Sequence, residues 1–305
     1  MRRGAGPILA ATQQEEGSVL QSLLELTTTG LAYGAVLFLV SSGLSITMGL
    51  MRFANLAHGA SVMFGGYAVV ALMQAGWPFL ATLPAAFVLS ALGGLVAERA
   101  LLHVFYARPE HSQVLVTIGV VFVAMSVATY VWGPSQQPVN LPAFLSGRVS
   151  LGAVDISAYR IFVALCGLAI GLGLIVLLET SSLGARVRAA VDDRAMAESC
   201  GVDVTRLFAL VFALSAGMAG LGGALSINLL GLDPSFPLRY LVMILIVVAV
   251  GGAGSIRATL ISALALGMID SFAKYYFASF GAFTLYVVAA AALTWRPEGL
   301  FRRAA

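Results

Sequence analysis

Long, almost uncharged stretches separated by short polar intervals make up most of the chain. Most of them come close to the roughly 20 residues that an α-helix needs to cross a bilayer. Nine such stretches lie at residues 26–51, 53–76, 78–97, 113–132, 159–178, 207–230, 238–250, 258–273 and 282–295. Their apolar character is continuous rather than alternating, which excludes a transmembrane β-barrel. The pattern therefore predicts an all-α polytopic membrane protein with about eight or nine transmembrane helices, some of them discontinuous.

Composition leads to the same class of protein. Of the 305 residues, 60% are hydrophobic and only 10% are charged. A soluble domain carries about 25% charged residues, so this chain cannot cover the surface of a soluble globular protein. The net charge of +3 informs membrane topology, and no nucleic-acid partner is expected. The two cysteines, Cys166 in an apolar stretch and Cys200 in a charged one, predict neither a disulfide nor a metal site.

Two polar regions lie outside the apolar stretches, one before the first stretch and one between the fourth and the fifth. Residues 1–25 hold five charged residues and an apolar patch too short for a signal peptide or a span. We expect them to form a partly disordered or interfacial N-terminal arm, followed by a single transmembrane domain over residues 26–303. Residues 133–158 are polar, rich in proline and free of clustered arginine, which favours an external loop.

The charged interval at residues 179–206 sets the orientation of the chain. It holds four arginines and five acidic residues between two apolar stretches, so it must emerge into water. Its arginines favour the cytoplasmic side. With nine spans, the C-terminus is then inside and the N-terminus outside, and eleven basic residues face inward against six outward. A broken first span, or a re-entrant eighth span, would move the N-terminus inside.

The same interval predicts one short surface helix over about residues 186–199. Ser181 or Ser182 can cap its start, Gly201 can end it in a left-handed conformation, and Asp203 can cap the next helix. An apolar stripe would form from Val187, Val191 and Met196. Such a helix could lie in a groove of another protein. It could equally lie flat on lipid headgroups, and the spacing alone does not separate the two.

A second polar feature opens the stretch at residues 53–76. Asn55 and His58 are three residues apart and would share a helix face, and Gly59 follows directly. A polar start rich in glycine is typical of a discontinuous helix that lines a transport pathway. Three interpretations remain open for Asn55 and His58: they satisfy backbone groups at the interface, contact a substrate, or form a gate.

Two further features have simpler interpretations. Residues 251–255, GGAGS, could cradle a phosphate, but no Lys-Ser/Thr pair follows, which favours a packed turn beside the charged loop. Asp270 and Lys274 lie four residues apart and can pair near the outer end of a span.

Several stretches of the chain resemble the permeases of branched-chain amino-acid (Liv-type) ABC importers. They are GLMRFANLAHGASVMFGGY at 49–67, SLGARVRAAVDDRAMAESCGVD at 182–203, GGAGSIRATLISALALGMIDS at 251–271 and RPEGLF at 296–301. The resemblance runs from about Gly30 to Arg303. It implies an ABC importer permease fold in which residues 179–206 form a cytoplasmic coupling loop.

The resemblance also implies partners and site residues. A second related permease subunit would complete the pathway, and two cytoplasmic ATPases would bind the coupling loops. A periplasmic binding protein would deliver the solute to the outer face of the permease. The location would be a bacterial inner membrane. The ATPase contacts would come from Gly184, Arg186, Arg188, Asp192, Arg194, Ala197 and Gly201. The pathway or gate would include Asn55, His58 and Gly59.

The chain departs from the family pattern at two places. The general importer signature, EAA followed by three residues and Gly, would fall on residues 195–197 and 201, where only Ala197 and Gly201 match. The acidic residue that usually follows AHG is Ala60 here, which bears on the substrate or the gate.

The chain carries no chemistry of its own. No GxxxxGK[ST] motif surrounds its single lysine, Lys274, so ATP and magnesium would bind to the partner ATPases, and this chain would be neither an enzyme nor a holder of cofactors. The alternative, a secondary transporter driven by an ion gradient, predicts several acidic residues near the membrane midplane, and only Asp270 lies well within a span. The substrate stays open between branched-chain amino acids and urea, an amide or another small polar solute.

Overall fold

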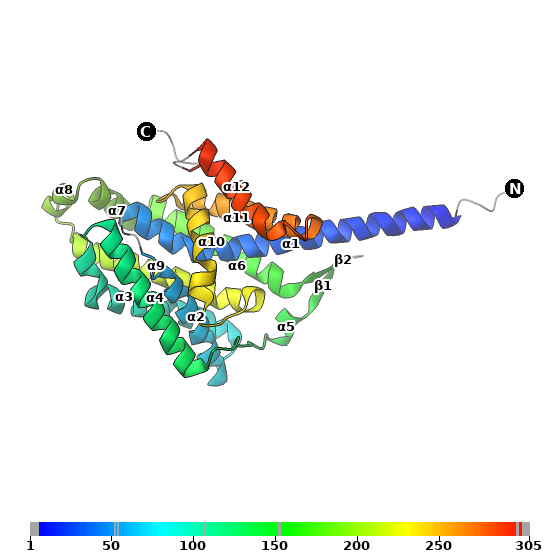
Figure 1. The fold of residues 1–305 in the computed structure, drawn as a ribbon, viewed down its shortest axis with the longest axis horizontal. Helices are drawn as coiled ribbons and strands as arrows, with labels where there is room; N and C mark the ends of the chain where they lie inside the picture. Colours follow the sequence, from blue (N-terminus) through cyan, green and yellow to red (C-terminus); the bar gives the residue numbers. More distant parts are fainter. Residues whose placement is uncertain are drawn as a thin grey trace.

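The computed structural model describes residues 6–51, 53, 55–106, 108–151, 154–296 and 299–300 (Figure 1). Arg2, Arg3 and Arg52 lie outside this set, as do the residues beyond 300, so the predictions that involve them, including the end of the domain at residue 303, fall outside the described residues.

Helices form almost the whole of the described chain. They are α1 Gly6–Leu50, α2 His58–Gln74, α3 Phe79–Ala100, the 3-10 helix η1 Leu102–Phe105, α4 Glu110–Trp132, α5 Ala143–Ser146, α6 Ala158–Thr180, α7 Ser182–Asp192, α8 Arg194–Ser199, α9 Val204–Leu230, α10 Phe236–Gly251, α11 Ile256–Tyr276 and α12 Gly281–Trp295. Two short strands, β1 Arg148–Leu151 and β2 Val154–Ser157, pair in antiparallel register with Arg148 opposite Ser157.

Six of these helices are long and apolar enough to cross a membrane, namely the part of α1 over residues 21–49, then α3, α4, α6, α9 and α11. The shorter helices α2, α10 and α12 fall on three further predicted stretches. The prediction of an all-α polytopic membrane protein is thus confirmed. The predicted external loop, in contrast, contains α5 and the β1–β2 hairpin, which its proline-rich sequence did not indicate.

The N-terminal region is helical and continuous with the first span. Residues 6–25 belong to α1 without a break at residue 25, and this part of the helix extends past the other helices (Figure 1). The physical reason is local, because after Pro7 the segment contains no proline and many strong helix formers such as Ala, Leu, Gln and Glu. Charge therefore marks where the apolar span starts, but it does not mark where the helix starts.

Helices α1 and α9 form the centre of the bundle. Helix α1 packs against α6, α9, α10 and α11, while α9 also packs against α2 and α3. Glycine allows these backbones to approach closely: a Cβ atom on Gly267 of α11 would lie 2.5 Å from the Cα of Gly34 of α1, and one on Gly65 of α2 would overlap the backbone of Gly220 of α9. Lipid supplies no hydrophobic force between helices, so such close packing is what holds the bundle together.

We predict that Gly267→Ala lowers the thermal stability of the purified protein in detergent. The new methyl group would overlap the α1 backbone at 2.5 Å, and overpacking of this kind costs about 1–3 kcal/mol. Gly119→Ala in α4 is the matched control, because a Cβ there meets nothing within 4 Å, and a Gly→Ala change in an open helix position gains about 0.5–1 kcal/mol. Equal melting temperatures for the two variants would contradict this account of the α1–α11 contact.

Candidate functional site

The charged loop folds into two helices rather than the single helix that its sequence predicted. Helix α7 ends at Asp192 and α8 begins at Arg194, because Asp193 between them is extended, with φ −146° and ψ 103°. The Asp193 carboxylate accepts a hydrogen bond from the backbone N–H of Met196 at 2.9 Å and so caps α8. Asp prefers this N-cap role to a helix interior, which explains the break.

The predicted N-caps on either side of the loop are present. The Ser181 hydroxyl accepts a hydrogen bond from the Gly184 N–H at 3.3 Å and starts α7. The Asp203 carboxylate accepts one from the Arg206 N–H at 3.0 Å and starts α9. Both helix ends next to the loop are thus defined by local hydrogen bonds.

Gly201 ends α8 in the left-handed conformation that the sequence predicted, with φ +83°. Its N–H donates to the Glu198 carbonyl at 3.0 Å, and the next N–H, of Val202, donates to the Ala197 carbonyl at 3.0 Å. This is the Schellman arrangement, which satisfies the free carbonyls at a helix C-terminus.

The predicted apolar stripe faces the bundle and is incomplete. Val187 is buried and Val191 is partly buried against the core, but Met196 is 62% exposed. Buried Ala190 and Ala197 take part in the inward face instead. The surface left for another protein is therefore mainly charged, because Arg186, Asp192 and Arg194 are exposed there together with Met196.

Gly184 brings α7 into backbone contact with the end of α6. The residue is buried, and a Cβ atom at this position would overlap the carbonyl oxygen of Leu178. Any other residue would push α7 away from α6, so the contact requires glycine.

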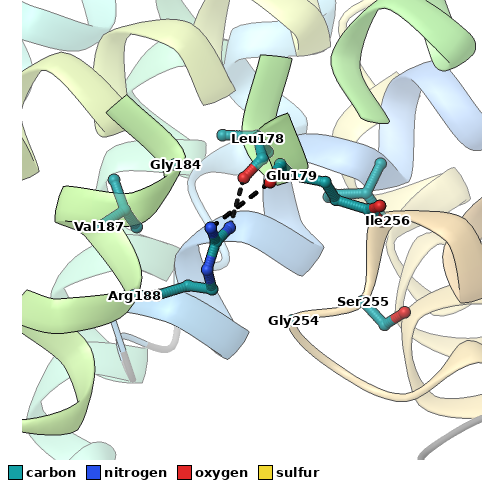
Figure 2. A pocket seen from close by; sticks show the side chains of 8 residues that line it. All are labelled: Leu178, Glu179, Gly184, Val187, Arg188, Gly254, Ser255 and Ile256. Atoms are coloured by element: carbon teal, nitrogen blue, oxygen red, sulfur yellow. Dashed lines mark hydrogen bonds between the residues drawn. The ribbon is translucent and has the colours of Figure 1, made fainter. Parts of the chain in front are cut away.

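Arg188 makes the second link between the loop and α6 (Figure 2). Its guanidinium donates hydrogen bonds to the backbone carbonyls of Leu178 at 2.6 Å and Glu179 at 3.5 Å. These carbonyls lie in the last turn of α6, where no helical N–H can reach them, and they carry the negative end of the helix dipole. Arg188 therefore holds α7 to α6 through groups that need a donor.

A cavity of about 190 Å³ lies beside Arg188, and its far wall comes from the turn before α11 (Figure 2). Gly254 and Ser255 line it on that side. At its edge the Glu179 carboxylate forms an ion pair with Arg257 near the start of α11. The pair joins the end of α6 to α11, and the sequence analysis missed it because the two residues are 78 positions apart.

The glycine-rich turn before α11 packs against the inner end of α1. A Cβ atom on Gly49 of α1 would overlap the backbone of Gly254. The Ser45 hydroxyl accepts hydrogen bonds from the Gly254 N–H at 3.3 Å and from the Thr259 hydroxyl at 2.9 Å. These contacts agree with a packed turn rather than a phosphate cradle.

Asn55 and His58 do not share a helix face, so that prediction is wrong. Helix α2 begins at His58, and Asn55 belongs to the irregular segment before it. The buried His58 ring places Nε2 2.6 Å from the Val40 carbonyl oxygen of α1. Gly59 lies against Pro237 of α10, where a Cβ would come within 3.2 Å. The structure thus brings these three residues to three different neighbours.

Asn55 instead lines a cavity of about 250 Å³ between α2, α3 and α4. The side chain is buried and its Oδ1 atom has no hydrogen-bond partner among the described residues. A buried amide oxygen without a partner calls for an explanation, and one that lines a cavity can bond a group that enters it.

Two other polar groups anchor the ends of the bundle. At the C-terminal end of α3, the buried Glu98 carboxylate accepts a hydrogen bond from the Tyr106 hydroxyl at 3.1 Å. Burial, followed by this carboxylate, raises the pKa of Tyr106 well above its usual range. Near the C-terminal end of α11, Lys274 pairs with buried Asp270 at 2.6 Å, as predicted from their spacing.

Comparisons with known proteins identify the family of the chain. Residues 26–294 match the family model described as the permease component of branched-chain amino acid transport systems. The high-affinity branched-chain amino acid transport system permease protein LivH of Escherichia coli K12 is 25% identical over 264 residues, covering 81% of this chain and 84% of that protein.

Two further relatives extend the comparison. The probable branched-chain amino acid transport permease protein LivH of Methanocaldococcus jannaschii is 28% identical, covering 81% of this chain and 80% of that protein. The high-affinity branched-chain amino acid transport system permease protein BraD of Pseudomonas aeruginosa is 24% identical, covering 92% and 96%. No solved structure matches the chain.

We predict that Arg188→Ala loosens α7 while Arg186→Ala does not. Arg188 bonds the α6 carbonyls, whereas the Arg186 side chain is exposed. Loss of these partly solvated bonds should cost about 1 kcal/mol, equivalent to a roughly fivefold faster amide hydrogen exchange over residues 182–192. Exchange rates that rise equally in both variants would show that Arg188 does not hold the helix.

Proposed function

Because the chain belongs to the family of permease components of branched-chain amino acid transport systems, we propose that it is the transmembrane permease subunit of an ATP-driven ABC importer for branched-chain amino acids or a related small polar solute. The observation that carries this function is the family match over residues 26–294. It coincides with an exposed, charged helix pair at one end of an apolar helical bundle. The protein is a multi-pass protein of the bacterial inner membrane.

In this proposal the α7–α8 pair is the docking surface for a cytoplasmic ATPase. Exposed Arg186, Asp192 and Arg194 would contact the ATPase directly. Gly184, Ala197 and Gly201 would act indirectly, because they set the position and the ends of the two helices. ATP and magnesium would bind to that partner. A second related permease subunit would complete the pathway, and a periplasmic binding protein would deliver the solute.

The contacts around the loop suggest a route for the motion that ATP binding produces. A displacement of α7 would act on α6 through the Gly184 backbone contact and Arg188. The Glu179–Arg257 ion pair would pass it to α11, and the Gly49–Gly254 contact would pass it to α1. The route would thus run from α7 through α6 to α11 and α1.

Asn55, His58 and Gly59 are proposed as parts of the gate. His58 attaches the start of α2 to α1, and Gly59 lets it lie against α10. A movement of α1 would therefore displace the irregular segment that carries Asn55. The free amide oxygen of Asn55 would then be available to bond a passing solute or to close against a neighbouring helix.

We expect ATP-dependent accumulation of labelled leucine in proteoliposomes that contain this chain with its partner permease, its ATPases and its binding protein. An ionophore that collapses ion gradients should leave the uptake intact, because the partner ATPases supply the free energy. Accumulation driven by an imposed proton or sodium gradient without ATP would contradict the proposal and favour a secondary transporter.

We also expect a charge exchange to test the route through α11. The single variants Glu179→Arg and Arg257→Glu place like charges together and should lower leucine uptake and substrate-stimulated ATPase activity several-fold. The double variant restores an opposite pair and should recover most of both. A half-exposed ion pair contributes only about 0–1 kcal/mol to stability, so melting temperatures should stay close to that of the wild type. Singles with full activity, or a double variant without recovery, would remove this pair from the route.

A further inference from the structure

A larger cavity than the two described above lies at the end of the bundle opposite α7 and α8. It measures about 420 Å³ and is formed by α1, the β1–β2 hairpin, the start of α6 and the end of α9. Figure 1 shows the hairpin beside α1 at this end of the bundle. The volume falls within the about 300–1,000 Å³ of sites that bind small molecules, whereas the cavity at Asn55 does not reach it.

Charged side chains of both signs line this cavity. Glu25 comes from α1, Arg148 and Asp155 from the hairpin, and Arg160 from α6. In the described part of the chain no ion pair joins any of these four to another charged residue, although six ion pairs form elsewhere. Because these oppositely charged groups do not form ion pairs with one another, they can bind the charged groups of a ligand.

Neutral groups contact three of the four charges. The Gln21 side-chain amide donates to the Glu25 carboxylate at 3.5 Å. The Arg160 guanidinium donates to the Thr29 hydroxyl at 2.8 Å, and the Asp155 carboxylate accepts from the Ser150 hydroxyl across the hairpin. Arg148 has no hydrogen-bond or ion-pair partner for its side chain within the described ranges. A guanidinium matches a carboxylate with two parallel hydrogen bonds, and a carboxylate such as that of Glu25 accepts bonds from an ammonium group.

Aliphatic side chains complete the wall between the charges. Leu145 and Ile156 are buried, at 4% and 3% exposure, and Leu141 and Leu229 lie beside them along the cavity. If this region were only a charged surface in contact with water, it would not need buried aliphatic side chains between its charged groups. The cavity therefore combines an anion-binding group, cation-binding groups and an apolar wall.

We infer that this cavity binds a free α-amino acid with an aliphatic side chain, with Arg148 on the carboxylate and Glu25 on the ammonium group. The inference rests on the proposed function and deepens it, because it adds a first binding site in the permease at the face where the solute arrives. The ethanolamine headgroup of a zwitterionic phospholipid carries the same two charges, so the test must separate the two sources.

The test uses the full-length chain in nanodiscs of phosphatidylglycerol, with L-leucine as the probe and titration calorimetry as the measurement. We expect saturable binding of leucine. Leucinamide lacks the carboxylate and 4-methylpentanoate lacks the ammonium group, so each should bind at least tenfold more weakly. Arg148→Ala and Glu25→Gln should each weaken leucine binding at least tenfold. Arg296→Gln, which changes the charge at the opposite end of the bundle, should leave it unchanged.

Three outcomes would overturn the inference. They are no leucine binding, equal binding of the two analogues, and loss of leucine binding when phosphatidylethanolamine is added to the nanodiscs, which would assign the cavity to a lipid headgroup. If the assembled importer accumulates leucine with ATP while the permease alone does not bind it, only this inference fails. If the assembled wild-type importer does not accumulate leucine, the proposed function fails instead.

Discussion

Backbone contact at glycine is the interaction on which the rest of this structure depends. In lipid the tails are as apolar as the side chains, so helices associate only where they fit closely. The contacts at Gly34–Gly267 and Gly65–Gly220 join the central helices α1 and α9 to their neighbours. The same kind of contact recurs at Gly49–Gly254 and at Gly184–Leu178, where the functional loop meets the bundle. Stability and coupling therefore rest on one kind of contact.

Charged side chains contribute little to the stability of this framework, but some of them join one element to another. The Arg194–Glu198 and Arg206–Asp203 pairs join residues three or four positions apart, are well exposed and stabilise only their own helix ends, by about 0.3–0.5 kcal/mol each. Arg188, in contrast, reaches from α7 to the α6 carbonyls. This longer contact joins the loop to a neighbouring helix, which the exposed pairs do not do.

Sequence reasoning succeeded where the cause is local and failed where it is not. The spans, the caps at Ser181 and Asp203 and the left-handed Gly201 follow from hydrophobicity and from short-range hydrogen bonds, so they could be predicted. The separation of Asn55 from His58 could not, because tertiary contacts decide where α2 begins. His58 contacts the Val40 carbonyl, 18 residues earlier in the chain. The Glu179–Arg257 pair could not be predicted either, because it depends on the tertiary packing of α6, α11 and α1 against one another.

Helix α11 contacts other elements at both ends, which makes it the element best placed to connect the two ends of the bundle. Near its N-terminal end Arg257 pairs with Glu179 of α6. Near its C-terminal end Lys274, which pairs with Asp270 of the same helix, lies 5.6 Å from the centre of the Tyr33 ring of α1, within reach of a cation–π contact. A helix of 21 residues is about 31 Å long, and the close glycine contacts with α1 along it oppose bending. A force applied at Glu179 would therefore shift α11 as a rigid body rather than deform it, and the outer end of α1 would receive the motion without any flexible element between them.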